Sequence, residues 1–166
     1  MNAVSRVFLV ARGVAWTLGF VLLWTWIATS VRTWDDAIGF AIPRALRPIG
    51  WGVAAAGALL AVSCIATFLS RGRGTPAPFD APRVFVASGP YRWVRNPMYL
   101  GAAALILGVG LAVGSPAIVL LAPAFLLIAH VVVITIEEPG LAARFGDAYE
   151  QYRANVAPWH LRVPRN

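Results

Sequence analysis

The stretch Ser88-Gly-Pro-Tyr-Arg-Trp-Val-Arg-Asn-Pro-Met-Tyr-Leu-Gly101 lies between two apolar parts of the chain and crowds arginines, tyrosines and prolines into a few residues. Within it, Asn96-Pro97 predicts a helix start, because asparagine is a preferred N-cap and proline a preferred first helical residue. The apolar runs 98–114 and 117–136 follow as a hairpin that ends at the carboxylate pair Glu137-Glu138. We therefore expect two polar motifs to meet at one membrane face.

Three apolar runs decide the fold class, namely Val7–Val31, Ile49–Leu69 and Ala117–Ile136. Each approaches or exceeds the roughly 20 residues that span the hydrocarbon core of a bilayer, and none contains an acidic residue. With 59% hydrophobic residues in a chain of 166, a soluble domain could not bury all three. The sequence predicts an all-α polytopic membrane helix bundle. If the short run 98–114 also crosses, rather than being tilted, kinked or partly re-entrant, the bundle has about four transmembrane helices.

We expect one integral membrane domain over residues 1–166. Its expected parts are two N-terminal transmembrane helices in 1–70, a cytoplasmic loop with the first motif in 71–97, the membrane hairpin in 98–136, and the second motif with a tail in 137–166. In the tail, Leu141, Phe145, Tyr149 and Tyr152 fall on one helical face. This pattern predicts an amphipathic helix lying on the cytoplasmic surface.

The net charge of +7 comes entirely from arginine, since the chain has no lysine. In the four-helix arrangement, all the arginines except Arg32, Arg44 and Arg47 lie on the side of both termini, which the positive-inside rule places in the cytoplasm. Anionic lipid headgroups therefore explain the charge, and a nucleic-acid partner is not expected. The alanine- and arginine-rich composition favours a bacterial inner-membrane protein. Small residues in 49–69 would let helices approach closely and would permit a homodimer.

The two polar motifs each admit two interpretations. Arg92 and Arg95 could contact headgroups or hold a carboxylate, and Tyr91 and Tyr99 could be interfacial aromatics or line a nucleoside pocket. Glu137-Glu138 follows twenty apolar residues, where carboxylates are costly unless they meet partners. Alternatively, Pro139 restarts the chain and makes both glutamates first-turn residues of the tail helix. No cysteine or histidine grouping has metal-ligand spacing, so no metal is expected.

These motifs resemble those of the isoprenylcysteine carboxyl methyltransferase and phospholipid methyltransferase superfamily. The resemblance covers about 88–158 and rests on Gly89-Pro-Tyr-x-x-x-Arg95-x-Pro97-x-Tyr99-x-Gly101, followed by Glu137-Glu138-x-x-Leu141-x-x-x-Phe145-Gly146-x-x-Tyr149-x-x-Tyr152. Many members of that family carry histidine where this chain has Asn96. Asparagine keeps the capping and hydrogen-bonding capacity but cannot titrate, so acid–base work is not assigned to it.

The resemblance implies S-adenosylmethionine bound at the cytoplasmic face and a lipophilic or small-molecule methyl acceptor admitted from the membrane. Arg95 and Glu138 are implied as catalytic residues. The residues implied to contact the cofactor are Tyr91, Arg95, Asn96, Pro97, Tyr99, Leu100, Gly101, Glu137 and Glu138.

Two other functions stay open at this point. The first is an NADPH-dependent reductase of related membrane architecture, whose extra phosphate would need arginines. The second is a non-catalytic membrane scaffold, in which the arginines bind only headgroups. The acceptor itself, whether carboxylate, amine or thiol, is not readable from the residues.

Overall fold

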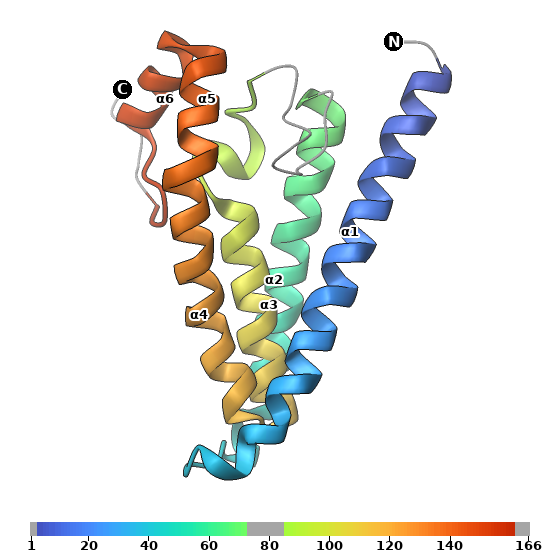
Figure 1. The fold of residues 1–166 in the computed structure, drawn as a ribbon, viewed down its shortest axis with the longest axis vertical. Helices are drawn as coiled ribbons and strands as arrows, with labels where there is room; N and C mark the ends of the chain where they lie inside the picture. Colours follow the sequence, from blue (N-terminus) through green and yellow to red (C-terminus); the bar gives the residue numbers. More distant parts are fainter. Residues whose placement is uncertain (1–2, 73–84, 162–166) are drawn as a thin grey trace. The chain divides into compact units, whose positions relative to one another are not determined.

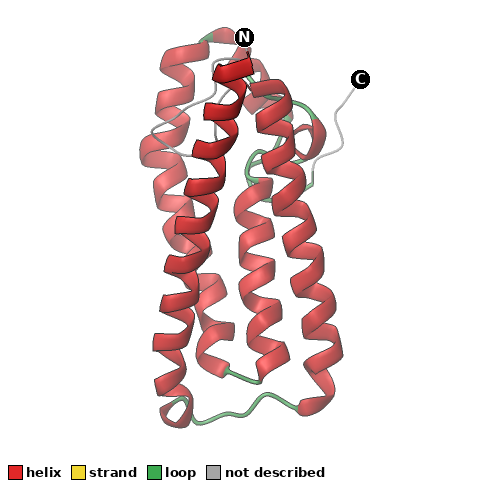
Figure 2. Cartoon of the chain, turned by 90° about the vertical axis from the view of Figure 1, so that its right-hand side faces the viewer, coloured by secondary structure: helices red, strands yellow, loops and turns green. Residues whose placement is uncertain are grey.

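The computed structural model describes residues 3–72 and 85–161. This part of the chain contains helices and loops and no strand (Figure 2), which confirms the all-α prediction. The helices, labelled in Figure 1, are α1 Ala3–Val31, α2 Arg47–Thr67, α3 Pro97–Val113, α4 Pro116–Val132, α5 Glu138–Phe145 and α6 Asp147–Asn155. Three short 3₁₀ segments, η1 Arg32–Ala37, η2 Arg44–Leu46 and η4 Gly89–Arg92, and two π turns, η3 Phe68–Gly72 and η5 Val133–Glu137, adjoin them.

Three helical segments are long and apolar enough to cross a membrane, namely Ala11–Ala37, Arg44–Arg71 and Pro116–Phe145. They coincide with the three apolar runs of the sequence and identify an integral membrane protein. Helix α3 is apolar throughout but has only 17 residues, so a fourth full crossing stays a prediction. Residues 73–84 of the expected cytoplasmic loop and residues 162–166 of the tail lie outside the described part of the chain.

The chain divides into two compact units that alternate along the sequence. We call Met1–Phe20, Val62–Pro97 and Val132–Asn166 the motif unit, and Val21–Ala61 and Met98–Val131 the hairpin unit. Each unit is described by itself below. The expected single domain stays a prediction, because this division into units does not test it.

Glycines hold α2 and α3 together in the hairpin unit. A Cβ atom on Gly57 would lie 2.5 Å from both the carbonyl oxygen of Gly101 and the backbone nitrogen of Leu105, and Gly50 meets Ala112 in the same way. The two backbones therefore touch, as expected for lipid-embedded helices that associate by van der Waals packing. Of the small residues that suggested this contact, Gly52 has no neighbouring atom at its Cβ position. The contact follows the small residues Gly50, Ala54, Gly57 and Ala61, which are spaced alternately by four and three residues along α2.

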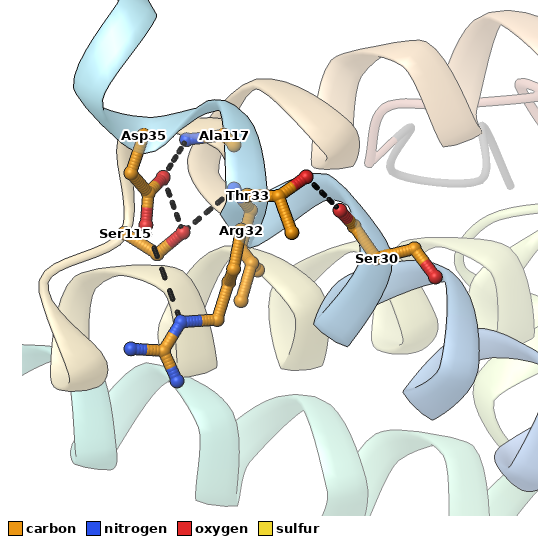
Figure 3. Close-up of polar contacts among 7 residues, drawn as sticks. Ser30, Arg32, Thr33, Asp35, Ser115 and Ala117 are labelled. Atoms are coloured by element: carbon orange, nitrogen blue, oxygen red, sulfur yellow. Dashed lines mark hydrogen bonds and ion pairs between the residues drawn. The ribbon is translucent and has the colours of Figure 1, made fainter.

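An aspartate that follows α1 caps the start of α4, also within the hairpin unit. Oδ1 of Asp35 accepts a hydrogen bond of 2.8 Å from Oγ of Ser115 and one of 3.0 Å from the backbone nitrogen of Ala117 (Figure 3). The first backbone N–H groups of a helix lack partners within the helix, and a carboxylate satisfies them with a favourable charge. Trp24 of α1 also packs edge-on against Phe125 of α4, with ring centroids 4.7 Å apart. The connector thus fixes the turn between α3 and α4.

The helix that begins as α4 continues through η5 into α5, all as one apolar segment to Phe145. It ends at Gly146, whose φ of 52° and ψ of −129° favour glycine. Helix α6 begins directly afterwards at Asp147. The expected tail helix over 141–152 is therefore two helices with a break at Gly146, and the single-helix prediction was wrong in this respect. Its proposed face is correct, because Tyr149 is buried and Leu141, Phe145 and Tyr152 are half-buried.

Candidate functional site

The first motif begins with a turn that only glycine allows. Gly89 has a φ of 60°, and a Cβ atom there would lie 2.8 Å from Oγ1 of Thr67. The 3₁₀ segment η4 then buries the side chain of Tyr91 and stacks its ring edge-on against Phe68, with centroids 5.1 Å apart. Burial, with the thiol of Cys64 beside it, holds the pKa of Tyr91 well above its usual value. Tyr91 is therefore a neutral, buried side chain of the motif unit.

A largely buried ion pair joins the two motifs. Nη2 of Arg95 lies 3.2 Å from Oε1 of Glu138, and the side chains are 11% and 16% exposed. The second carboxylate oxygen, Oε2, lies 3.9 Å from Nε of Arg153, which belongs to α6 and is half exposed. Arg153 also approaches Oε1 of Glu150, at 3.6 Å. Glu138 thus serves as acceptor for one buried and one exposed guanidinium.

Arg95 retains donor capacity beyond this pair. Among the residues that the structure describes, its Nε and Nη1 atoms are buried and have no hydrogen-bond partner. A buried charged donor without an acceptor costs free energy of the order of 1–3 kcal/mol or more. Arg95 is therefore a candidate to bind an acceptor group of a ligand.

Three hydrogen bonds tie the tail to the first motif. The backbone nitrogen of Arg95 donates to the carbonyl oxygen of Ala157 at 2.9 Å, and Nδ2 of Asn96 donates to that of Pro158 at 3.1 Å. The hydroxyl of Tyr152 donates to the carbonyl oxygen of Tyr91 at 2.6 Å. The tail therefore covers the stretch between Tyr91 and Asn96.

An aromatic cluster supports this cover from the side of α5 and α6. The ring of Phe85 packs against Phe145 at 5.4 Å, against Tyr149 at 6.1 Å and against Tyr152 at 5.1 Å between centroids. Burial is also the largest cause that raises the pKa of Tyr152, with Arg95 opposing it. The hydroxyl of Tyr152 consequently keeps its proton at neutral pH and stays a donor.

Glu137 and Glu138 both lie in helical backbone, where η5 meets α5. Glu137 has φ −74° and ψ −50° and Glu138 has φ −62° and ψ −45°, so both are helical, and the π turn η5 leads into α5 without a break. Helix α5 begins at Glu138 with Pro139 in its first turn, so Glu138 is a first-turn acidic residue of α5, as one of the two interpretations expected. Glu137 precedes this first turn as the last residue of η5.

The structure brings together most of the site residues expected from the sequence. Six of them lie in the motif unit, namely Tyr91, Arg95, Asn96, Pro97, Glu137 and Glu138. Asn96 directly precedes α3 and Pro97 is its first residue, as predicted.

Tyr99, Leu100 and Gly101 belong to the hairpin unit. There, Tyr99 lies 6.1 Å from Phe125 between ring centroids, and Gly101 meets Gly57 and Ala61. Arg92 is exposed and stacks over the ring of Trp93 at 5.0 Å.

Sequence reasoning missed Arg153 and the tail carbonyls of Ala157 and Pro158. No spacing singles out Arg153, because its approach to Glu138 depends on the reversal at Gly146. That reversal did have a signal, since glycine after an apolar helix followed by aspartate is typical of a helix end and a new helix start. Within the described residues, no group of three or more histidine, cysteine, aspartate or glutamate side chains could hold a metal ion.

Comparison with known proteins identifies the family. The family model described as phospholipid methyltransferase matches residues 46–148. This match covers more than half of the chain, so the protein belongs to the phospholipid methyltransferase family and is a membrane methyltransferase. No significant match was found among curated proteins or among solved structures.

Proposed function

Starting from that family membership, we propose that the protein transfers the methyl group of S-adenosylmethionine to a lipophilic or small acceptor at the cytoplasmic membrane face. The observation that carries the proposal is the largely buried guanidinium of Arg95. One of its nitrogens pairs with Glu138, and the other two have no hydrogen-bond partner among the residues that the structure describes. Such a donor suits the carboxylate that an amino-acid-derived cofactor presents.

The residues of the motif unit fit this cofactor in their chemistry. S-adenosylmethionine, when bound, supplies a methyl group on a positively charged sulfonium. Arg95 would hold the carboxylate of the cofactor, and Glu138 would hold Arg95 while its negative charge offsets the positive charge brought into the site. The ring of Tyr91 and the side chain of Glu137 lie in the same unit and suit a cation. We propose Tyr91, Arg95, Asn96, Pro97, Glu137 and Glu138, with Tyr99, Leu100 and Gly101 of α3, as the cofactor-binding residues.

The catalytic work left to the protein is mainly positioning. Methyl transfer needs a donor and an acceptor aligned at about 3 Å with water excluded, and holding reactants in this way lowers the barrier substantially. We assign Arg95 to alignment through the carboxylate, and the tail, with its buried Val156 and Ala157, to exclusion of water. If the acceptor is an amine, Glu138 is the group proposed to accept its proton. If it is a carboxylate or thiolate, no base is required.

The proposed orientation follows from charge. The described arginines beside the motifs are Arg71, Arg92, Arg95, Arg144 and Arg153, and the positive-inside rule places such a side in the cytoplasm. We propose a bacterial inner membrane with both termini cytoplasmic. Reporter fusions at the C-terminus and after Gly39 should give opposite compartments.

Titration calorimetry with S-adenosylmethionine and with NADPH tests the function. We expect the purified protein in detergent to bind S-adenosylmethionine and not NADPH. Arg95→Gln should abolish this binding, whereas Arg92→Gln, an exposed arginine of the same motif, should retain it. Binding of NADPH alone would support the reductase, and binding of neither compound would leave the scaffold and overturn the proposed function.

A further inference from the structure

Asn96 makes a contact that its place before α3 does not require. Its amide nitrogen Nδ2 donates to the carbonyl oxygen of Pro158, in the tail, at 3.1 Å. The side chain is buried, with 8% of the residue exposed. An N-cap asparagine uses its side-chain oxygen for the helix, so the amide nitrogen is free for a second function.

This hydrogen bond is the second of two that join consecutive residues of the first motif to consecutive residues of the tail. One residue earlier, the backbone nitrogen of Arg95 donates to the carbonyl oxygen of Ala157 at 2.9 Å. Helix α6 ends at Asn155, and Val156 is extended with φ −118° and ψ 127°. The tail thus leaves α6, runs against Arg95 and Asn96, and is buried at Val156 and Ala157.

We infer that Asn96 is a positioning residue: its amide latches the tail at Pro158 and thereby sets the orientation of Arg95 toward the cofactor carboxylate. The inference rests on the proposed function and names a role for Asn96 within that site. Arg95 links the tail to the proposed cofactor site. The tail fixes its backbone, and two of its buried side-chain nitrogens have no hydrogen-bond partner among the described residues. A loosened tail leaves the Arg95 backbone without its hydrogen bond and its guanidinium oriented by Glu138 alone.

This role assigns Asn96 to binding and not to proton transfer. An amide does not titrate in the physiological range, and its hydrogen bond to a neutral carbonyl is independent of pH there. Loss of the latch should therefore weaken cofactor binding without changing the pH dependence of the reaction. A residue that transferred a proton would change that pH dependence when it is replaced.

Four variants of the full chain test the latch. Asn96→Asp keeps the size and the capping oxygen but removes the N–H donor, and Asn96→Leu removes the donor without adding charge. Asn96→His restores a donor. The control is Asn155→Leu, because Nδ2 of Asn155 also donates to a backbone carbonyl, that of Gln151 at 2.8 Å, but at an exposed position inside α6.

Hydrogen exchange followed by mass spectrometry gives a readout that does not depend on activity. In Asn96→Asp and Asn96→Leu, peptides that contain Arg95 and peptides that contain Val156 should exchange about tenfold faster, as expected for the loss of roughly one hydrogen bond. The dissociation constant of S-adenosylmethionine should rise by about the same factor. Asn96→His should recover at least part of both effects, and Asn155→Leu should change neither.

The outcomes separate the latch from the proposed function. Unchanged exchange in both Asn96 variants overturns the latch. Faster exchange with unchanged cofactor affinity overturns the positioning role, while the proposed function stands. If the wild-type protein does not bind S-adenosylmethionine, the proposed function and the positioning role are both overturned. The exchange data then test only whether Asn96 holds the tail.

Discussion

The guanidinium of Arg95 lies 3.2 Å from the carboxylate of Glu138, although Arg95 precedes α3 and Glu138 is the first residue of α5. This ion pair is the contact through which the two sequence motifs become one site. It is largely buried, so its geometry matters more than that of an exposed pair. It also leaves Arg95 with unused donors, which is why we assign it to a ligand.

Replacing Glu138 by glutamine should disrupt this site. The variant removes the charge that compensates Arg95, and breaking a buried pair from one side costs about 3 kcal/mol. We expect loss of S-adenosylmethionine binding in calorimetry and a lower melting temperature of the detergent-solubilised protein. Glu150→Gln is the matched control, because Glu150 also pairs with Arg153 but is exposed. Wild-type affinity in Glu138→Gln would remove Glu138 from the cofactor site.

The contact between α2 and α3 should be sensitive to a single methyl group. Gly57→Ala forces the methyl against the backbones of Gly101 and Leu105 and should lower the free energy of unfolding by about 1–3 kcal/mol. Gly52→Ala, on the same helix, meets no atom within 4 Å and should be neutral or slightly stabilising. Unfolding in mixed micelles measures both. Equal effects of the two substitutions would contradict the packing.

The aspartate cap on α4 should be worth about 2 kcal/mol of unfolding free energy. Asp35→Ala removes the acceptor for Ser115 and for the backbone nitrogen of Ala117, so both buried donors lose their partner. Thr33→Ala is the control, because Thr33 donates only to the nearby carbonyl of Ser30 at an exposed position. Thermal unfolding of the two variants should differ clearly, and an identical midpoint would argue against the cap.

Alkaline pH should weaken the tail contact through Tyr152 and Tyr91. Burial raises the pKa of both phenols in the folded protein above that of an unfolded tyrosine, about 10. The folded state then binds more protons than the unfolded state above that pH, so stability is full below about pH 10 and falls as pH rises beyond it.

The variant Tyr152→Phe tests this pH dependence. It loses the hydrogen bond to the carbonyl oxygen of Tyr91 and should be less stable at pH 8, with a smaller decline of melting temperature between pH 9 and 11. A melting temperature that falls equally steeply in the wild-type protein and in this variant would show that Tyr152 does not contribute to the decline.

From the sequence, the residues of the two motifs could be proposed, but several of the contacts that join them could not. The first motif and Glu138 could be proposed because their residue types and order are local features of the chain. The roles of Arg153 and Pro158 could not, since both depend on the reversal at Gly146 and the extended path after α6. For the same reason, the sequence left open whether Arg95 contacts a headgroup or holds a carboxylate, and our assignment to a ligand is a proposal that its burial supports.

The sequence by itself determined that this is an all-α membrane protein, because apolar runs of membrane length have few other stable states than spanning helices. It also determined where α3 starts, through Asn96-Pro97, and which face of the tail is apolar. Only the tertiary structure decided that Glu138 meets Arg95, that Gly50, Ala54, Gly57 and Ala61 are the small residues of α2 that contact α3, and that the amide of Asn96 donates to the tail. These outcomes depend on contacts between residues far apart in the chain, which no local spacing encodes.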